Sequence, residues 1–173
     1  MRRALILHPA SRCAAVERIE VEIERPGATQ LLLRYTVTGR VGDLRLPPNA
    51  APVRADGLWK HTCFEAFLRP IPGTAYSEFN FAPSTQWAAY RFSDTRADMR
   101  NADVAPPRIT TQLEDGRYHL EAIFEIDAVA SRLGISAVIE ETGGQISYWA
   151  LAHPASKPDF HHCGSFVADL PGV

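Results

Sequence analysis

Several segments of the chain alternate apolar and polar residues with a period of two. This is the pattern of a β-strand that has one face toward a core and the other toward water. Isoleucine and valine alternate with glutamate through residues 16–24, and residues 31–38 repeat the pattern with threonine and arginine on the polar side. Pro26-Gly27 supplies turn residues between the two segments. Together these segments predict an antiparallel hairpin.

The middle of the chain predicts three further strands. Residues 62–68 (TCFEAFL) are apolar on both parities apart from Glu65, which is typical of a central strand covered on both faces. Residues 76–81 alternate cleanly, and residues 86–92 follow as the next strand. Residues 40–58 are rich in Pro, Gly, Asn and Asp and carry little periodicity, so we expect a long loop that helps to form a site.

Two more hairpins are predicted in the second half of the chain. Residues 108–113 and 117–126 flank an Asp-Gly pair, which tolerates the positive φ angles of tight turns. Residues 136–141 and 146–152 flank Gly143-Gly144 in the same way. The resulting nine or ten short strands indicate an antiparallel sheet protein.

One short helix is predicted at residues 127–133, because an Asp stands at its start and Gly134 at its end. Many short strands with turn residues between them and almost no helix favour an all-β fold. We therefore expect a two-sheet antiparallel sandwich, immunoglobulin-like or jelly roll, in a single domain of residues 1–173.

Charge and composition exclude several classes of protein. The formal net charge is -2 and the Lys and Arg residues are scattered, so a nucleic acid is not an expected partner. The apolar run at residues 4–7 is shorter than a signal-peptide core or a membrane span, so we expect a cytoplasmic protein with no membrane contact. Three widely spaced cysteines indicate reduced thiols rather than disulfides.

Three segments between residues 58 and 162 carry a resemblance to a known superfamily. They read LWKHTCFEAFLRPIPGTAYSEFNFAPSTQWAAYRF, YHLEAIFEIDAVASRLGI and ISYWALAHPASKPDFHH. The first resembles the Trp, acid-containing and Tyr-and-Glu strands of DOMON-like domains and family 9 carbohydrate-binding modules. The resemblance implies an immunoglobulin-like or jelly-roll β-sandwich that binds a sugar, or haem in some branches, without covalent chemistry.

Tryptophans are the first candidates for a sugar site, because an indole ring can stack on the apolar face of a pyranose. The chain has three, Trp59, Trp87 and Trp149. Trp59 stands beside His61 at the entrance of a predicted strand, where an aromatic ring can form the rim of a cleft. Packing in the core is the alternative for each of the three.

Glu65 is the most informative acid, because a carboxylate in an apolar strand must be hydrogen-bonded, paired or shifted in pKa. Glu78 and Asn80 share the polar parity of the next strand, and Arg91 lies one strand further. These side chains can form a cluster that binds hydroxyl groups. A structural Glu-Arg pair is the alternative, and glycoside hydrolysis by Glu65 and Glu78 is a less favoured one.

The C-terminal segment is the candidate for a metal or haem site, because it gathers His153, Asp159, His161 and His162 within ten residues. Zinc, calcium or haem are the groups considered, although none is expected to be required. Adjacent His161 and His162 point apart in an extended chain, which weakens joint ligation. A loop that packs on the sandwich is the alternative.

The sequence therefore predicts a non-catalytic ligand-binding domain, with a saccharide as the favoured ligand. A haem- or metal-binding protein and a structural or partner-binding domain are the two alternatives. No nucleophile elbow, phosphate-binding loop or dinucleotide fingerprint is present to indicate an enzyme. The predicted ligand-binding residues are Trp59, His61, Glu65, Glu78, Asn80, Trp87, Arg91 and Trp149.

Overall fold

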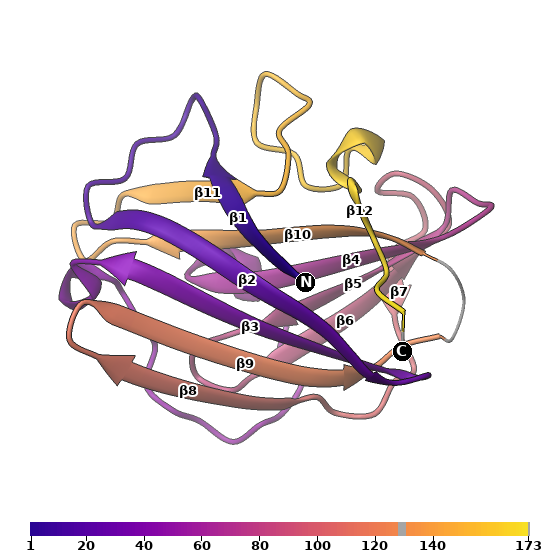
Figure 1. Ribbon diagram of the computed structural model, residues 1–173, viewed down its shortest axis with the longest axis horizontal. Coiled ribbons are helices and arrows are strands. Elements are labelled where there is room, and N and C mark those ends of the chain that lie inside the picture. Colours follow the sequence, from indigo (N-terminus) through magenta and orange to yellow (C-terminus); the bar gives the residue numbers. More distant parts are fainter. Residues whose placement is uncertain (128–130, 173) are drawn as a thin grey trace.

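The computed structural model describes residues 1–127 and 131–172, which form strands joined by loops and three single-turn 3₁₀ helices (Figure 1). The first strands and turns are β1 (Arg2–Leu7), β2 (Val16–Gly27), β3 (Gln30–Gly39), η1 (Val41–Asp43), η2 (Leu58–Lys60), β4 (Cys63–Pro70), β5 (Tyr76–Phe81) and β6 (Trp87–Phe92). The others are β7 (Arg100–Asn101), β8 (Arg108–Glu114), β9 (Arg117–Glu125), β10 (Ser131–Glu140), β11 (Ile146–Ala150), η3 (Cys163–Ser165) and β12 (Ala168–Asp169).

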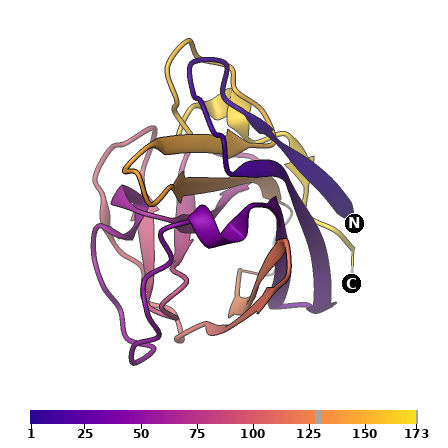
Figure 2. The same ribbon diagram turned by 90° about the vertical axis from the view of Figure 1, so that its left-hand side faces the viewer.

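The strands pair into one continuous antiparallel sheet in the order β7-β6-β5-β4-β10-β11-β1-β2-β3-β9-β8, and β12 also pairs with β10. The sheet curls so that its two halves face each other (Figure 2). The all-β prediction is confirmed, whereas two separate sheets are not. The reason is β1, in which Arg2–Leu5 pair with β2 and Ile6 and Leu7 pair with β11.

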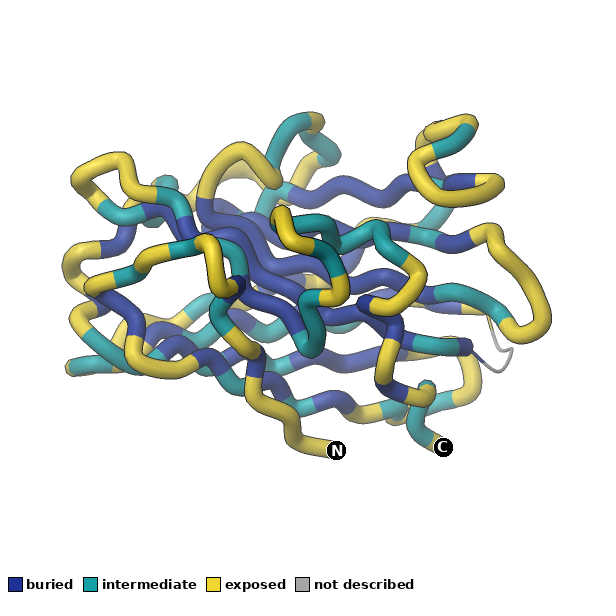
Figure 3. The backbone as a smooth tube through the Cα atoms, turned by 90° about the horizontal axis from the view of Figure 1, so that it is seen from above, coloured by how far each residue is buried: buried dark blue, intermediate teal, exposed yellow. Residues whose placement is uncertain are grey.

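The core fills the space between the facing halves, and the buried residues are concentrated in the strands, whereas the loops at their ends are mostly exposed (Figure 3). Alternation places Ile19, Val21 and Ile23 of β2 in this core and the glutamates between them outside. Across the core, the hydroxyl of Tyr35 in β3 donates a hydrogen bond to the backbone carbonyl of Glu65 in β4, at 2.9 Å. This bond ties the two halves together.

The predicted hairpins are confirmed by the pairing of β2 with β3, β8 with β9 and β10 with β11. The N-terminal strand β1 was not predicted. Its sequence, RRALIL, alternates too briefly to be distinguished from a short apolar run. Pairing with strands that are distant in sequence, rather than local pattern, makes it a strand.

The helix predicted at residues 127–133 is wrong for residues 131–133, which begin strand β10. Ser131, Arg132 and Leu133 pair with β4, and the last two also pair with β12. Residues 128–130 lie outside the described residues. An N-cap typically stabilises a helix by only about 1 kcal/mol, so pairing with two neighbouring strands outweighs these local helix signals.

The strand β4 is buried on both faces, as its sequence predicts. Its inner face joins the main core, while its outer face joins a second apolar cluster made with β5, β6 and the C-terminal segment. Phe67, Tyr76 and Phe166 are buried in this second cluster, with ring centroids 5.5 to 6.4 Å apart. The outer face of this half of the sheet is thus partly covered, and a cavity remains beside the cover.

Within the described residues, no helix has the length and apolar character needed to cross a membrane.

Candidate functional site

A cavity of about 580 Å³ lies on the outer face of β4, β5, β6, β10 and β11. Acidic side chains from β4 and β5 contribute to its surface, and η2 and the loop that precedes η3 add further residues. Its aromatic residues are Trp59, Tyr90, Phe92, Tyr148 and Phe160. Its charged or titratable residues are Lys60, Glu65, Glu78, Tyr90, Arg96, Tyr148 and His161.

Glu65 and Glu78 are the buried acids of the cavity. Glu65 in β4 is 2% exposed and Glu78 in β5 is 5% exposed. The strand register pairs Glu65 with Asn80, so that the two acids are diagonal neighbours on one face of the sheet. The Ser136 hydroxyl donates to Oε2 of Glu65 at 3.0 Å, and the Asn80 amide donates to Oε1 of Glu78 at 2.7 Å.

Burial raises the pKa of both carboxyl groups. For Glu78 the effect raises the pKa to about 7, although the hydrogen bond from Asn80 and the charge of Arg96 act in the opposite direction. For Glu65, burial and then repulsion from Glu78 raise the pKa well above its ordinary value. Two close carboxylates in such a site do not both ionise readily near neutral pH, and the pair therefore retains a proton there.

His161 forms the wall beside Glu78. The hydroxyl of Tyr76 lies 2.7 Å from Nδ1 of His161, and Nε2 of His161 lies 3.7 Å from Oε2 of Glu78. Burial and the charge of Arg96 lower the pKa of His161 to about 4. The imidazole loses its proton near pH 4 and Glu78 loses its own near pH 7, so there is no pH at which the two form a full ion pair.

The aromatic rings of the cavity come from three separate parts of the chain. Trp59 in η2 is 37% exposed and contacts Tyr90 in β6 edge to face, with centroids 5.9 Å apart. Tyr148 in β11 and Phe160 in the C-terminal loop form a second pair at 6.1 Å. The hydroxyl of Tyr90 donates to Asp56 at 2.7 Å, which holds this ring against the loop before η2.

The other two tryptophans belong to the core. Trp87 is 4% exposed and packs in the main cluster, with the guanidinium of Arg54 4.4 Å above its ring. Trp149 is 5% exposed, and its indole nitrogen donates to the buried Ser147 hydroxyl at 3.0 Å. Both rings thus pack in the core, which is the alternative to a sugar site that the sequence left open.

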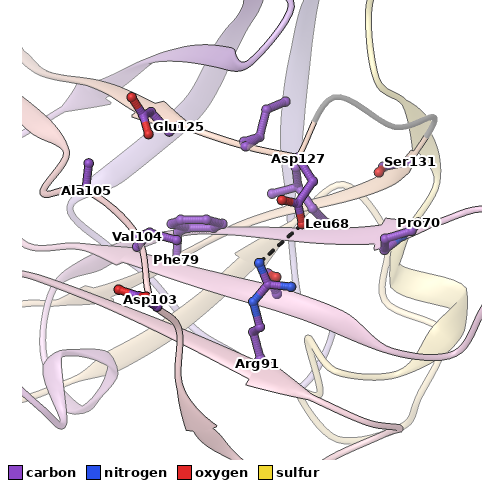
Figure 4. Close-up of a pocket in the computed structure, with 12 residues that line it drawn as sticks. Leu68, Pro70, Phe79, Arg91, Asp103, Val104, Ala105, Glu125, Asp127 and Ser131 are labelled. Atoms are coloured by element: carbon purple, nitrogen blue, oxygen red, sulfur yellow. Dashed lines mark hydrogen bonds and ion pairs between the residues drawn. The ribbon is translucent and has the colours of Figure 1, made fainter.

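Arg91 does not join the cluster of Glu65 and Glu78. The register pairs Arg91 with Ser77, on the opposite face of the sheet from Glu78. There it lines a separate pocket of about 250 Å³ and forms an ion pair with Asp127 at 3.2 Å (Figure 4). The expectation that this arginine lies with the two acids is wrong, because alternation in β6 directs Tyr90 rather than Arg91 to their side.

His61 lies outside this cavity. Its Nδ1 is 2.7 Å from Glu140, whose other carboxylate oxygen accepts a hydrogen bond from Arg45 at 2.7 Å. These three residues line a neighbouring cavity of about 660 Å³ that is bounded by the loop of residues 45–48 and by residues 55–58. The long loop therefore does contribute to a cavity, on the other side of the η2 turn from Trp59.

The proposed metal ligands are engaged in separate contacts. His153 Nε2 lies 2.7 Å from the backbone carbonyl of Ile6, and the carboxylate of Asp159 pairs with Arg96 at 2.8 Å. Nδ1 of His162 accepts from the amide of Gly164. Among residues 1–127 and 131–172, no group of three or more His, Cys, Asp or Glu side chains is arranged to hold a metal ion.

Sequence reasoning missed several residues of the cavity, namely Tyr90, Phe92, Arg96, Tyr148 and Phe160. For Tyr90 and Phe92 the signal was limited to their shared parity in β6, because the face that this parity takes depends on the register that pairs Glu78 with Tyr90. For Tyr148 and Phe160 there was none, since they reach the cavity from segments that are distant in sequence.

No protein-family model matches the chain, and no curated protein matches it. Among solved structures, one from Bacteroides uniformis described as a "putative carbohydrate-binding protein" has a similar fold, with a TM-score of 0.72. The match covers 98% of this chain and 84% of that protein, at 13% sequence identity. At this identity the similarity establishes a shared fold.

Proposed function

We propose that the protein is a non-catalytic saccharide-binding domain and that the cavity on the outer face of β4, β5 and β6 is its binding site. The observation that carries this proposal is the combination of aromatic rings with the buried Glu65–Glu78 pair around one opening. We further propose that residues 1–173 form one domain of the DOMON-like sandwich class. The similar solved structure supports both proposals at the level of the fold.

The chemistry of the cavity suits a sugar ring. A pyranose has apolar C–H faces and a rim of hydroxyl groups, so it needs flat apolar surfaces and convergent polar groups. Trp59 contributes an indole ring to the wall of the cavity, and this residue is 37% exposed. The carboxyl groups of Glu65 and Glu78 can accept hydrogen bonds from hydroxyls, and the protonated member of the pair can donate one. The volume is within the usual range of roughly 300 to 1,000 Å³ for ligand sites.

The arrangement of the acids favours binding over hydrolysis. Glycosidases place two carboxyl groups on either side of the scissile bond. Here Glu65 and Glu78 project from the same face of one sheet as diagonal neighbours, so both approach a ligand from the same side. This geometry supports a role in gripping hydroxyl groups.

The test is a titration of the purified protein with neutral and amino mono- and disaccharides, followed by calorimetry and thermal unfolding. A ligand that binds only the native state raises the apparent stability. We expect saturable binding to a member of the panel, a change in tryptophan fluorescence, and a loss of affinity of about tenfold or more in Trp59→Ala.

Glu22→Gln is the matched control, because this half-buried glutamate lies on β2, away from the cavity. The control is expected to bind like the unmodified protein. Zinc, calcium and haem are included in the same panel. The proposal is overturned if no saccharide binds, or if binding persists unchanged in both Trp59→Ala and Glu78→Gln.

A further inference from the structure

Among the described residues, neither buried acid of the cavity forms a salt bridge with a Lys or Arg side chain, although the charge of Arg96 lowers the pKa of both. Among the described residues, the carboxyl group of Glu65 accepts a hydrogen bond only from the neutral hydroxyl of Ser136. The neighbours of Glu78 are the Asn80 amide and the imidazole of His161. Burial of a carboxylate without a counter-charge is costly, so the ionised form of either acid destabilises the folded protein.

Neither of the two cations that line the cavity forms a salt bridge with Glu65 or Glu78. The guanidinium of Arg96 is bound to Asp159 at 2.8 Å, and the Arg96 side chain is 59% exposed. The Lys60 side chain lies beside Gly57 of its own turn. Glu65, at 2% exposure, therefore directs a carboxyl group into the cavity with no ionic partner among the described residues.

We propose that the ligand of this cavity carries a protonated amine that sits against Glu65 and Glu78, and that the saccharide it takes is an amino sugar. An ammonium group donates up to three hydrogen bonds, which suits acceptor oxygens on two strands. The aromatic rings of the walls favour a cation by the attraction of their π faces. The amino-sugar part of this inference rests on the proposed saccharide-binding function.

The amine also has a consequence for protons. The cavity pair keeps a proton near neutral pH, and an ammonium group stabilises both carboxylates, so binding expels protons from the site. The charged or titratable groups that face or adjoin the pair are Lys60 of η2, Cys63 of β4, Tyr76 of β5, Tyr90 of β6, Arg96 of the β6–β7 loop, Tyr148 of β11, and Asp159 and His161 of the C-terminal loop. Of these, His161 is already neutral above its pKa of about 4 and releases nothing.

The experiment compares ligands that differ in the amine. The full chain is titrated by calorimetry at pH 6.5 with the disaccharide of two glucosamine units, its N-acetylated counterpart, cellobiose and cyclohexylamine. Each titration is repeated in two buffers of different ionisation enthalpy, which reports proton release. We expect the glucosamine disaccharide to bind at least about tenfold more tightly than its acetylated counterpart, with protons released.

Variants assign the effect to the two acids. Glu78→Gln and Glu65→Gln keep the shape and the hydrogen-bonding reach of the side chains and are expected to reduce the preference for the amine toward unity and to abolish proton release. Glu22→Gln is expected to retain both. Thermal unfolding of each variant verifies that it is folded, and the two variants are independent, so one that fails to fold leaves the other as the test.

The outcomes separate this inference from the proposed function. If cellobiose or the acetylated disaccharide binds as tightly as the glucosamine disaccharide or more tightly, the inference of an amine is overturned and the proposal of a saccharide-binding protein stands. Binding of cyclohexylamine as tight as the glucosamine disaccharide supports the amine and overturns the saccharide. If none of the four probes binds, the amine is overturned, and the wider panel of mono- and disaccharides decides the saccharide separately.

Discussion

The hydroxyl of Tyr76 lies 2.7 Å from Nδ1 of His161, and this hydrogen bond joins strand β5 to the C-terminal loop at the edge of the cavity. The same oxygen accepts the backbone N–H of Arg96 at 3.1 Å. One phenol thus positions both the imidazole beside Glu78 and the segment that carries the cavity's guanidinium. The wall of the site is fixed by a residue that is itself 4% exposed.

Replacing Tyr76 by Phe removes both hydrogen bonds and leaves the Arg96 amide without this acceptor. We expect Tyr76→Phe to lower the free energy of unfolding by about 1 to 3 kcal/mol, because a buried group that loses its partner keeps its desolvation cost. Hydrogen exchange at residues 159–163 should accelerate as the loop loosens. Chemical denaturation and exchange measure the two effects.

Tyr148→Phe is the matched control for this substitution. Tyr148 lines the same cavity, but no hydrogen bond of its hydroxyl is found among the described residues, so its loss should change stability by less than about 0.5 kcal/mol. Equal destabilisation by the two variants would show that the Tyr76 hydroxyl does not anchor the loop.

Glu78→Gln should alter how stability depends on pH. The pKa of Glu78 is raised from 4.5 to about 7 on folding, so its stabilising contribution is complete below pH 4.5 and is lost as the pH rises through 7. The loss is about 3 kcal/mol for a shift of this size. The variant does not undergo this loss, so its stability relative to the unmodified protein should increase as the pH rises from 4.5 to 8. Denaturation of both proteins at each pH measures the difference. A constant difference across this range would contradict the raised pKa.

His161→Asn should show the opposite trend. The pKa of His161 is lowered from 6.5 to about 4, so its contribution is complete above pH 6.5 and is lost as the pH falls through 4. The variant should gain stability relative to the unmodified protein on acidification, by up to about 3 kcal/mol. Glu65, whose pKa is also raised, loses stability with rising pH as Glu78 does. Between pH 4.5 and 6.5, His161→Asn should therefore make the loss of stability with rising pH steeper than in the unmodified protein, and Glu78→Gln should make it shallower.

Trp149→Ala should destabilise the fold by about 3 to 5 kcal/mol, because the ring is buried in the main core and its indole N–H is bonded to Ser147. Trp59→Ala should cost less than about 1 kcal/mol, since its ring is 37% exposed. Thermal denaturation of both variants checks this contrast. A large loss in Trp59→Ala would assign this residue to the fold rather than to the cavity.

The strands were predictable because alternation is a local property of the backbone. The hairpins around residues 25–30, 114–117 and 141–146 follow from period-two patterns and turn residues alone. The predictions failed where pairing with strands distant in sequence determines the secondary structure. Residues 131–133 carry helix-ending signals yet extend β10 beside β4 and β12. Strand β1 gains its place from two strands that are far away in sequence.

The candidate site divides in the same way. Glu65 could be recognised because a carboxylate in an apolar strand demands an explanation, and Glu78 shares the parity of Asn80. Arg91 could not be placed, because which parity of β6 faces Glu78 depends on the register of the β5–β6 pair. Register is set by the turn geometry at residues 82–86 and is not visible in the alternation of either strand.

The alternation of β4, β5 and β6 separates two sets of side chains along the same strands. Phe64, Ala66 and Phe79 face the core, whereas Glu65, Glu78 and Tyr90 face the cavity. A combinatorial library limited to Glu65, Glu78 and other cavity-facing positions outside the second apolar cluster would leave the buried apolar residues untouched. The scaffold is therefore well suited to directed evolution of new ligand specificities, because recognition can be diversified while the folding information in the neighbouring positions is retained.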